Sequence, residues 1–185
     1  LAIHLYRTFK VSNNQITPKT REALIQVQKQ GVKIVLASGR PTAGLRHEAK
    51  ELMLDQFGGY LLSFNGARVA SAKTNETIYE QTLTVEDAQK TYQRAKQFDL
   101  ACMTYKNDMI YTEDIDDEYV CLEAKINDIH KNKVSSFIDI LENPIHKVLL
   151  TGKPDYVASI ESEFKKPFGD SLSIYRSAPF FLEVM

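Results

Sequence analysis

The sequence predicts an α/β fold in which a parallel sheet precedes a region of mixed hairpins and helices. In the first part of the chain, a helical pattern over 17–30 is followed by the apolar run 34–37, and a second apolar run occupies 60–64. Short apolar runs without alternation are typical of buried parallel strands. A strand, a helix and a return strand in so few residues therefore predict a βα unit of a parallel sheet.

Local signals set the boundaries of the first elements. Thr17 is a good N-cap, Pro18 suits the first helical position, and Gly31 ends that helix. Asn65-Gly66 follows the last apolar run and is a strong hairpin turn. The expected order is a strand at 1–5, a helix at 17–30, a strand at 33–37, a helix at 43–54 and a strand at 60–64.

The pattern changes after about Thr77, where hairpins mix with helices and predict an α+β region with an antiparallel sheet. Thr84 caps a helix with Asp87 at its third position. The remaining expected elements are strands at 100–105 and 109–112, helices at 117–127 and 134–141, a strand at 147–151, a helix at 154–164, and strands at 172–176 and 180–184.

Composition excludes several classes of partner. The formal net charge of -1 over 185 residues leaves no basic footprint for nucleic acid or for an anionic membrane. No apolar run approaches the roughly 20 residues that span a bilayer. The first ten residues lack a signal-peptide pattern, so a cytoplasmic address is expected.

Cysteine, histidine and acidic residues give no metal-ligand spacing. Cys102 and Cys121 are too few for a disulfide framework and are predicted to be buried free thiols. The four histidines form no zinc pair. In the acidic run 113–118, a calcium loop would need glycine at Tyr119 and glutamate at Lys125, so a solvated helix start is predicted instead.

A candidate anion site follows the buried strand 33–37. Ser38 can donate a hydrogen bond, Gly39 allows close backbone approach, and Arg40 offers a planar fork for phosphate. Open α/β sheets bind ligands at the carboxyl ends of their strands, where Asn65-Gly66 forms a second polar lip. An ordinary strand-to-helix turn and a plain β-hairpin are the alternatives.

Four motifs in order resemble the Cof-type branch of the haloacid dehalogenase-like (HAD) phosphatases. They are Asn14–Pro18, Gly31–Pro41, Ser63–Ala67 and Ser177–Val184. The resemblance implies a Rossmann-like, HAD-like parallel-sheet core with an inserted α+β cap domain.

The implied domains are the N-terminal part of the core at 1–77, the cap at 78–180 and the start of a return to the core at 181–185. Because the chain stops at Met185, the core is expected to be incomplete, and its open edge and apolar face predict self-association.

The resemblance also implies a function, the hydrolysis of small phosphorylated metabolites such as sugar phosphates with Mg²⁺. Ser38 matches the family's second motif, which binds the transferring phosphoryl group. Gly39 and Arg40 lie beside it, and Asn65-Gly66 matches a loop that faces substrate.

The chain departs from the family at the first motif, Asp-x-Asp-Gly-Thr. Here His4 and Tyr6 occupy the positions of the nucleophile and the general acid/base, and Arg7 replaces the glycine. The family's lysine and magnesium-binding acidic motif, which follow the cap, are absent from the sequence. Because phosphoryl transfer by this route needs a carboxylate, a metal and a proton donor, we expect an inactive chain that does not bind Mg²⁺.

Two other hypotheses stay open. One is a genuine hydrolase whose termini are misreported or whose missing core part is supplied elsewhere. The other is a binding or protein-interaction module that uses the cap or the vestigial phosphate pocket.

Overall fold

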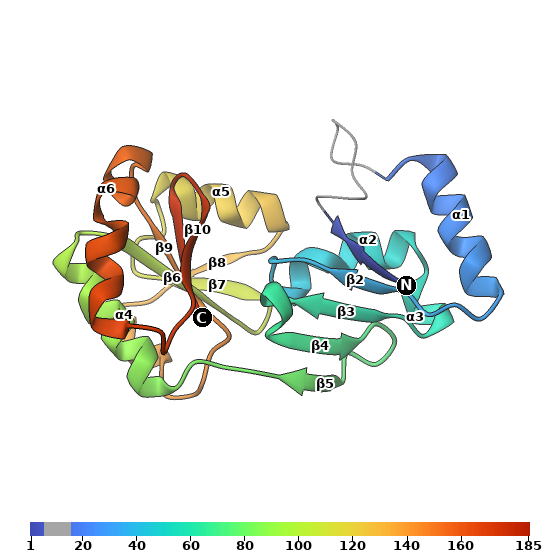
Figure 1. Ribbon diagram of the computed structural model, residues 1–185, viewed down its shortest axis with the longest axis horizontal. Coiled ribbons are helices and arrows are strands. Elements are labelled where there is room, and N and C mark those ends of the chain that lie inside the picture. The colour runs from blue at the N-terminus through green and yellow to red at the C-terminus, as the bar shows by residue number, and fades with distance from the viewer. Residues whose placement is uncertain (6–15) are drawn as a thin grey trace. The chain divides into compact units, whose positions relative to one another are not determined.

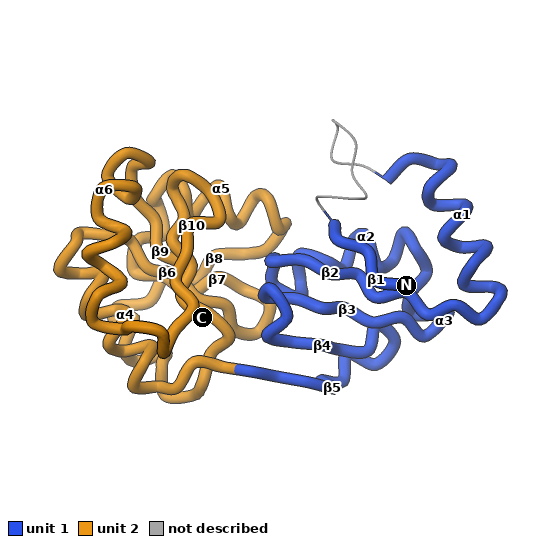
Figure 2. Tube along the Cα trace, viewed as in Figure 1, with its two compact units in different colours: residues 1–81 blue, residues 82–185 orange. Residues whose placement is uncertain are grey.

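The computed structural model describes residues 1–5 and 16–185. The chain divides into two compact units, Leu1–Gln81 and Thr82–Met185 (Figure 2). Each unit has its own sheet and its own core of buried apolar side chains. The two units are therefore described separately.

The first unit is built on a five-stranded sheet with the order β1-β2-β3-β4-β5 (Figure 1). β1 pairs in parallel with β2, and β2 with β3, whereas β4 and β5 continue the sheet as antiparallel strands. The strands are β1 (Ala2–His4), β2 (Val35–Ala37), β3 (Tyr60–Ser63), β4 (Arg68–Ser71) and β5 (Thr77–Glu80). The predicted α/β class and the parallel strands are confirmed.

The first helix, α1 (Pro18–Lys29), begins and ends where the sequence predicts. The Thr17 hydroxyl accepts a 3.2 Å hydrogen bond from the amide of Thr20, and Pro18 occupies the first helical position. Gly31 follows the helix with a φ of +91°, a left-handed conformation that glycine adopts without strain. Leu24 on α1 packs into the core of this unit with Ile3 and Leu36 from the sheet.

The predicted single helix over 43–54 is wrong. The structure has a 3₁₀ helix η2 (Thr42–Leu45), then α2 (Arg46–Glu51) and α3 (Leu54–Phe57), with Met53 left-handed between them at a φ of 56°. Leu52 and Leu54 are both fully buried. Two positions in one straight helix that lie two apart face different sides, so the break lets both leucines enter the same core.

The second unit has a six-stranded sheet with the order β10-β11-β9-β6-β7-β8, antiparallel except for the β7–β8 pair. The strands are β6 (Ala101–Lys106), β7 (Met109–Thr112), β8 (Lys131–Lys133), β9 (Val148–Thr151), β10 (Ile174–Ala178) and β11 (Phe181–Val184). The predicted hairpin of β6 and β7 is therefore confirmed.

Three longer helices cover this second sheet: α4 (Val85–Gln97), α5 (Glu118–Asn127) and α6 (Pro154–Lys165). The predicted cap Thr84 accepts a 3.1 Å hydrogen bond from the amide of Asp87 at the start of α4. Asp117 caps α5 by accepting bonds from Tyr119 and Val120. Across the described ranges 1–5 and 16–185, no helix has the length and apolar character needed to cross a membrane.

Two boundaries differ from the expectation. β5 pairs with β4, so the first unit extends to Gln81 rather than to residue 77. β11 lies between β10 and β9, so residues 181–185 belong to the second unit rather than to a return to the first. β11 pairs antiparallel with β10 on one side and with β9 on the other, and this pairing keeps residues 181–184 in the second sheet.

The predicted helix over 134–141 is also wrong. Only the 3₁₀ turn η4 (Ile138–Ile140) forms there, between the buried Phe137 and Leu141. The amide of Val134 instead donates to the Thr112 carbonyl at 2.9 Å, which keeps the chain extended beyond β8. Phe137 and Leu141 are four residues apart, a spacing that is also typical of one face of a helix. Here the two side chains are buried in the core on either side of a single 3₁₀ turn.

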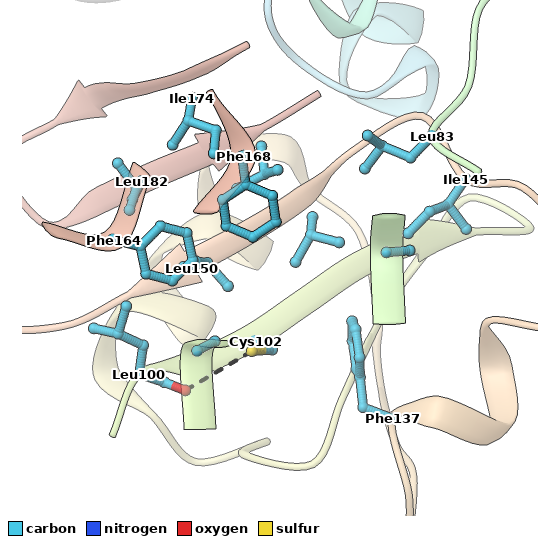
Figure 3. Packing of buried hydrophobic residues seen from close by; sticks show 14 of the residues in the cluster. Leu83, Leu100, Cys102, Phe137, Ile145, Leu150, Phe164, Phe168, Ile174 and Leu182 are labelled. Carbon is cyan, nitrogen blue, oxygen red and sulfur yellow. Dashed lines mark hydrogen bonds between the residues drawn. The ribbon is translucent and has the colours of Figure 1, made fainter. Parts of the chain in front are cut away.

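The core of the second unit lies between the sheet and the helices α4 and α6. Figure 3 shows Phe164 of α6 and Phe168 of the following turn η5 (Lys166–Phe168) beside Leu150 of β9. The rings of Phe164 and Phe168 are stacked with their centroids 5.8 Å apart. Cys102 lies in this cluster, as predicted for a buried free thiol.

Candidate functional site

The carboxyl ends of the three parallel strands β1, β2 and β3 lie side by side in the first unit. The Cα partners His4, Ala37 and Leu62 form one row across the sheet. Ser38 and Ser63 are the next residues on their strands, so their side chains come at the edge where open α/β sheets bind ligands. The predicted position of Ser38 at the end of a buried strand is therefore found.

Ser38 is held by its neighbours. Its amide donates to the Leu62 carbonyl at 2.9 Å, which extends the pairing of β2 and β3 by one residue. Its hydroxyl oxygen accepts a 3.2 Å hydrogen bond from the amide of Arg40. The side chain is buried, and within residues 1–5 and 16–185 its hydroxyl proton is donated to no other atom. A hydroxyl that already accepts a backbone N–H keeps its own proton for a ligand.

The loop after β3 lies against the loop after β2. The amide of Phe64 donates to the Arg40 carbonyl at 2.9 Å, and that of Asn65 donates to the Ser38 carbonyl at 3.2 Å. Phe64, Asn65 and Gly66 all have positive φ angles, 50°, 53° and 101°. The predicted polar lip at Asn65-Gly66 thus stands beside Ser38. It is also a hairpin connection, because β3 and β4 pair antiparallel, but it spans residues 64–67 rather than a two-residue turn.

Gly39 makes the close approach of these loops possible. A Cβ atom at this position would lie 2.5 Å from the side-chain oxygen of Asn65. Carbon and oxygen atoms do not come so close, so a side chain at position 39 would force Asn65 or the loop to shift, and the constraint comes from this contact and not from the φ of Gly39. This supports the prediction that Gly39 allows close approach, although the approaching group seen here is Asn65.

Arg40 is directed into the protein. Its Nη1 atom donates to the Gly44 carbonyl at 3.1 Å and lies 3.5 Å from Oε1 of Glu48, and both side chains are buried. These contacts hold the guanidinium against η2 and α2. The predicted role of Arg40 as a phosphate ligand stays a prediction, and its observed contacts position the loop that carries Ser38.

The sequence patterns did not predict a second polar group beside the site, which consists of Thr42, Ser63 and Arg68. The hydroxyls of Thr42 and Ser63 are 2.7 Å apart, and Nη1 of Arg68 donates to Thr42 at 2.9 Å. Arg68 also bonds to the Thr77 hydroxyl and to the Asn75 carbonyl, so it joins β4, β5 and η2. The signal was available, because Arg68 follows the Asn65-Gly66 turn and faces Ser63 in the antiparallel register.

His4 lies at the end of β1 as an exposed side chain. Tyr6, the other residue that takes a catalytic position of the first motif, lies outside the described residues. The row from His4 to Ala37 places the imidazole-bearing strand end directly beside the strand that leads to Ser38.

A comparison with protein families gives the context of this arrangement. The model of the haloacid dehalogenase-like hydrolases matches residues 7–185. The chain belongs to this family. The resemblance drawn from the four motifs is therefore confirmed.

Individual HAD relatives agree with the family match. The chain is 30% identical over 189 residues to "Putative phosphatase YxeH" of Bacillus subtilis (strain 168), covering all of this chain and 69% of that protein. It is 34% identical to a haloacid dehalogenase-like hydrolase from Bacteroides thetaiotaomicron, with a TM-score of 0.93, covering 100% of this chain and 69% of that structure. The HAD subclass IIB sugar phosphatase BT4131, at 17% identity and a TM-score of 0.74, shares the fold.

HAD enzymes generally use Mg²⁺, so the donor atoms at this edge of the sheet decide whether the described residues fit that ion. Mg²⁺ prefers carboxylates and other hard oxygen ligands. The described ends of β1, β2 and β3 offer an imidazole, hydroxyls and an amide, but no carboxylate. In ranges 1–5 and 16–185, no group of three histidine, cysteine or acidic residues is placed to hold a metal. The described donor set therefore does not fit Mg²⁺.

Proposed function

We propose that this HAD-like chain binds the phosphate group of a small phosphorylated metabolite between the loop Ser38–Arg40 and the loop Phe64–Gly66. The observation that supports this most directly is the pair of backbone hydrogen bonds that joins the two loops beside the end of β1. The relative named a sugar phosphatase suggests sugar phosphates as the class to test first.

The chemistry of the site suits recognition of a phosphate oxygen. The Ser38 hydroxyl carries a proton that it can donate, since its oxygen already accepts from Arg40. Hydrogen bonds to an ionised acceptor are about twice as strong as neutral ones. The buried pair of Arg40 and Glu48 fixes the loop, so Ser38 needs little reordering when the ligand arrives.

We further propose that the chain binds phosphate without transferring it. In the proposed correspondence with the family's first motif, His4 takes the position of the nucleophilic aspartate, so an imidazole stands where the family's mechanism uses a carboxylate. Histidine can serve as a covalent nucleophile in other enzymes. Here, however, the described residues beside His4 supply neither a carboxylate for proton transfer nor a donor set that fits Mg²⁺.

Calorimetric titration with inorganic phosphate and with glucose 6-phosphate tests the binding proposal. We expect the unmodified chain to bind glucose 6-phosphate and Ser38→Ala to lose about tenfold in affinity, the effect of about 1.4 kcal/mol from one hydrogen bond to a charged group. Ser71→Ala is a matched control, because the Ser71 hydroxyl also accepts an amide two residues on, from Lys73. Equal binding by all three proteins, or no binding by any, contradicts the proposal.

Hydrolysis of p-nitrophenyl phosphate with added Mg²⁺ tests the second part. We expect no turnover above the background rate. Turnover that is removed by Ser38→Ala but kept by Ser71→Ala would show a working phosphatase and overturn the proposed inactivity, while leaving the binding site in place.

A further inference from the structure

A cysteine, a lysine and a backbone carbonyl meet in the second unit. Nζ of Lys131 lies 2.9 Å from Sγ of Cys121 and donates to the Ile115 carbonyl at 2.6 Å. The Cys121 thiol lies 3.6 Å from the same carbonyl oxygen. The ammonium group is therefore in direct contact with the sulfur and is fixed there by a second hydrogen bond.

Three separate elements bring these groups together. Cys121 lies in the first turn of α5, Lys131 begins β8, and Ile115 precedes α5. The side chains of Cys121 and Lys131 are both partly exposed. Cys121 is therefore partly accessible to solvent in the folded protein. The prediction of a buried thiol is therefore wrong for Cys121, although it holds for Cys102. The sequence pattern did not predict the contact between Cys121 and Lys131, because Lys131 lies in β8, a strand that was not expected.

Among the described residues, the Asp117 carboxylate near the start of α5 is engaged with other groups. Asp117, on the same helix, accepts bonds from the amides of Tyr119 and Val120 and from the Thr151 hydroxyl. Its charge is thus directed to the helix N-terminus. The charged group at contact distance from Sγ of Cys121 is the Lys131 ammonium.

The other cysteine has the opposite environment. Cys102 is buried in the core of the second unit, and burial raises the pKa of its thiol well above the ordinary range. Its sulfur donates only a long 3.8 Å bond to the Leu100 carbonyl (Figure 3). Buried thiols in apolar surroundings are inert, whereas partly exposed thiols beside a cation are reactive. The two cysteines therefore differ in burial and in whether a cation contacts the sulfur.

We propose that Cys121 is an oxidant-reactive thiol, a modification site for hydroperoxides, with Lys131 as the cation that stabilises its thiolate. The thiolate attacks one oxygen of hydrogen peroxide, an S–O bond forms and the O–O bond breaks. Sulfur loses two electrons, the peroxide gains them, and the departing hydroxide takes a proton from solvent to leave water and the sulfenic acid. The ammonium then holds the new oxygen as it held the sulfur.

The unmodified protein gives the first test. Iodoacetamide reacts with thiolates, and peptide mass spectrometry separates the two cysteines. We expect Cys121 in the folded protein to be alkylated at pH 7 several-fold faster than in the same chain unfolded in urea, and Cys102 to react far more slowly when folded. A Cys121 that reacts more slowly in the folded protein than in the unfolded one would overturn the proposal, and this comparison needs no variant to fold.

Charge variants give the second test. Lys131→Met keeps most of the side-chain volume and removes the ammonium, whereas Lys133→Met removes a cation from the same face of β8. We expect about a tenfold slower alkylation of Cys121 in Lys131→Met, near-normal alkylation in Lys131→Arg and no change in Lys133→Met. After treatment with hydrogen peroxide, dimedone should label Cys121 in the unmodified chain and in Lys133→Met. Equal rates and equal labelling in all the lysine variants would contradict the role of Lys131.

Discussion

The amide of Asn65 donates a 3.2 Å hydrogen bond to the carbonyl of Ser38, and this bond joins the loops that follow β3 and β2. The side chain of Asn65 at the same time comes so close to Gly39 that a Cβ atom there would lie 2.5 Å from its oxygen. Asn65 thus supports the loop of Ser38 through its backbone, and its side chain leaves little room for a Cβ atom at position 39.

Gly39→Ala should therefore destabilise the first unit by about 1–3 kcal/mol, the range for an added carbon in a tightly packed place. Asn65→Gly removes the opposing oxygen and keeps a residue that adopts the φ of 53° readily. In the double variant the two effects should not add, with a coupling of about 1 kcal/mol or more in urea unfolding. Additive effects of the two substitutions would show that Asn65 is not the obstacle.

Local signals in the sequence were reliable where one short segment decides the structure. Thr17 and Thr84 cap their helices as predicted, because the capping hydrogen bond joins residues three apart. The row of strand ends beside Ser38 was also predictable, since consecutive parallel strands end at one edge of their sheet.

Contacts between distant segments were not predictable in this way. Lys131–Lys133 has no apolar pattern, and it becomes a strand because β7 pairs with it in parallel. The buried pair of Arg40 and Glu48 joins residues eight apart, which is not a neighbour spacing on one helix. The break at Met53 likewise depends on how two leucines enter the core.

The buried ion pair of Arg40 and Glu48 gives a second prediction. Glu48→Ala leaves the Arg40 guanidinium buried without this carboxylate and should cost about 3 kcal/mol in the free energy of unfolding. Glu22→Ala removes an exposed carboxylate from α1 of the same unit and should change stability by less than about 0.5 kcal/mol. Hydrogen exchange of amides in α1 and β2 measures the first unit by itself, and equal effects of the two substitutions would contradict the prediction.

A third prediction concerns pH and the carboxylate of Glu113 in the second unit. Its Oε1 atom accepts bonds from the Tyr92 hydroxyl and the Phe137 amide, both at 2.7 Å, and its Oε2 atom lies 2.7 Å from Nζ of Lys96. Burial acts to raise the pKa of Glu113, but the bonds from Lys96, Phe137 and Tyr92 outweigh it and hold that pKa below the ordinary value of 4.5.

Because the pKa of Glu113 is lower in the folded than in the unfolded chain, its contribution to stability is complete above pH 4.5. The contribution is lost as the pH falls through the folded-state pKa. The pKa of Tyr92 is raised to about 12 by burial, by the hydrogen bond to Glu113 and by the charge of Glu113. The Tyr92 hydroxyl therefore keeps its proton at every pH between 3 and 7. Tyr92 therefore does not contribute to the change in stability with pH, and that change reports on the Glu113 carboxylate.

Glu113→Gln should lower the free energy of unfolding by about 1–2 kcal/mol at pH 7, since it removes the charge that three donors share. Near pH 3 the difference from the unmodified chain should shrink, because acid neutralises the same charge. Glu86→Gln is the control in the same unit, because its pair with Lys90 is exposed to solvent and its loss should leave the free energy of unfolding nearly unchanged at either pH. A Glu113→Gln difference in urea unfolding that stays constant from pH 7 to pH 3 would show that the charge of Glu113 does not stabilise the fold.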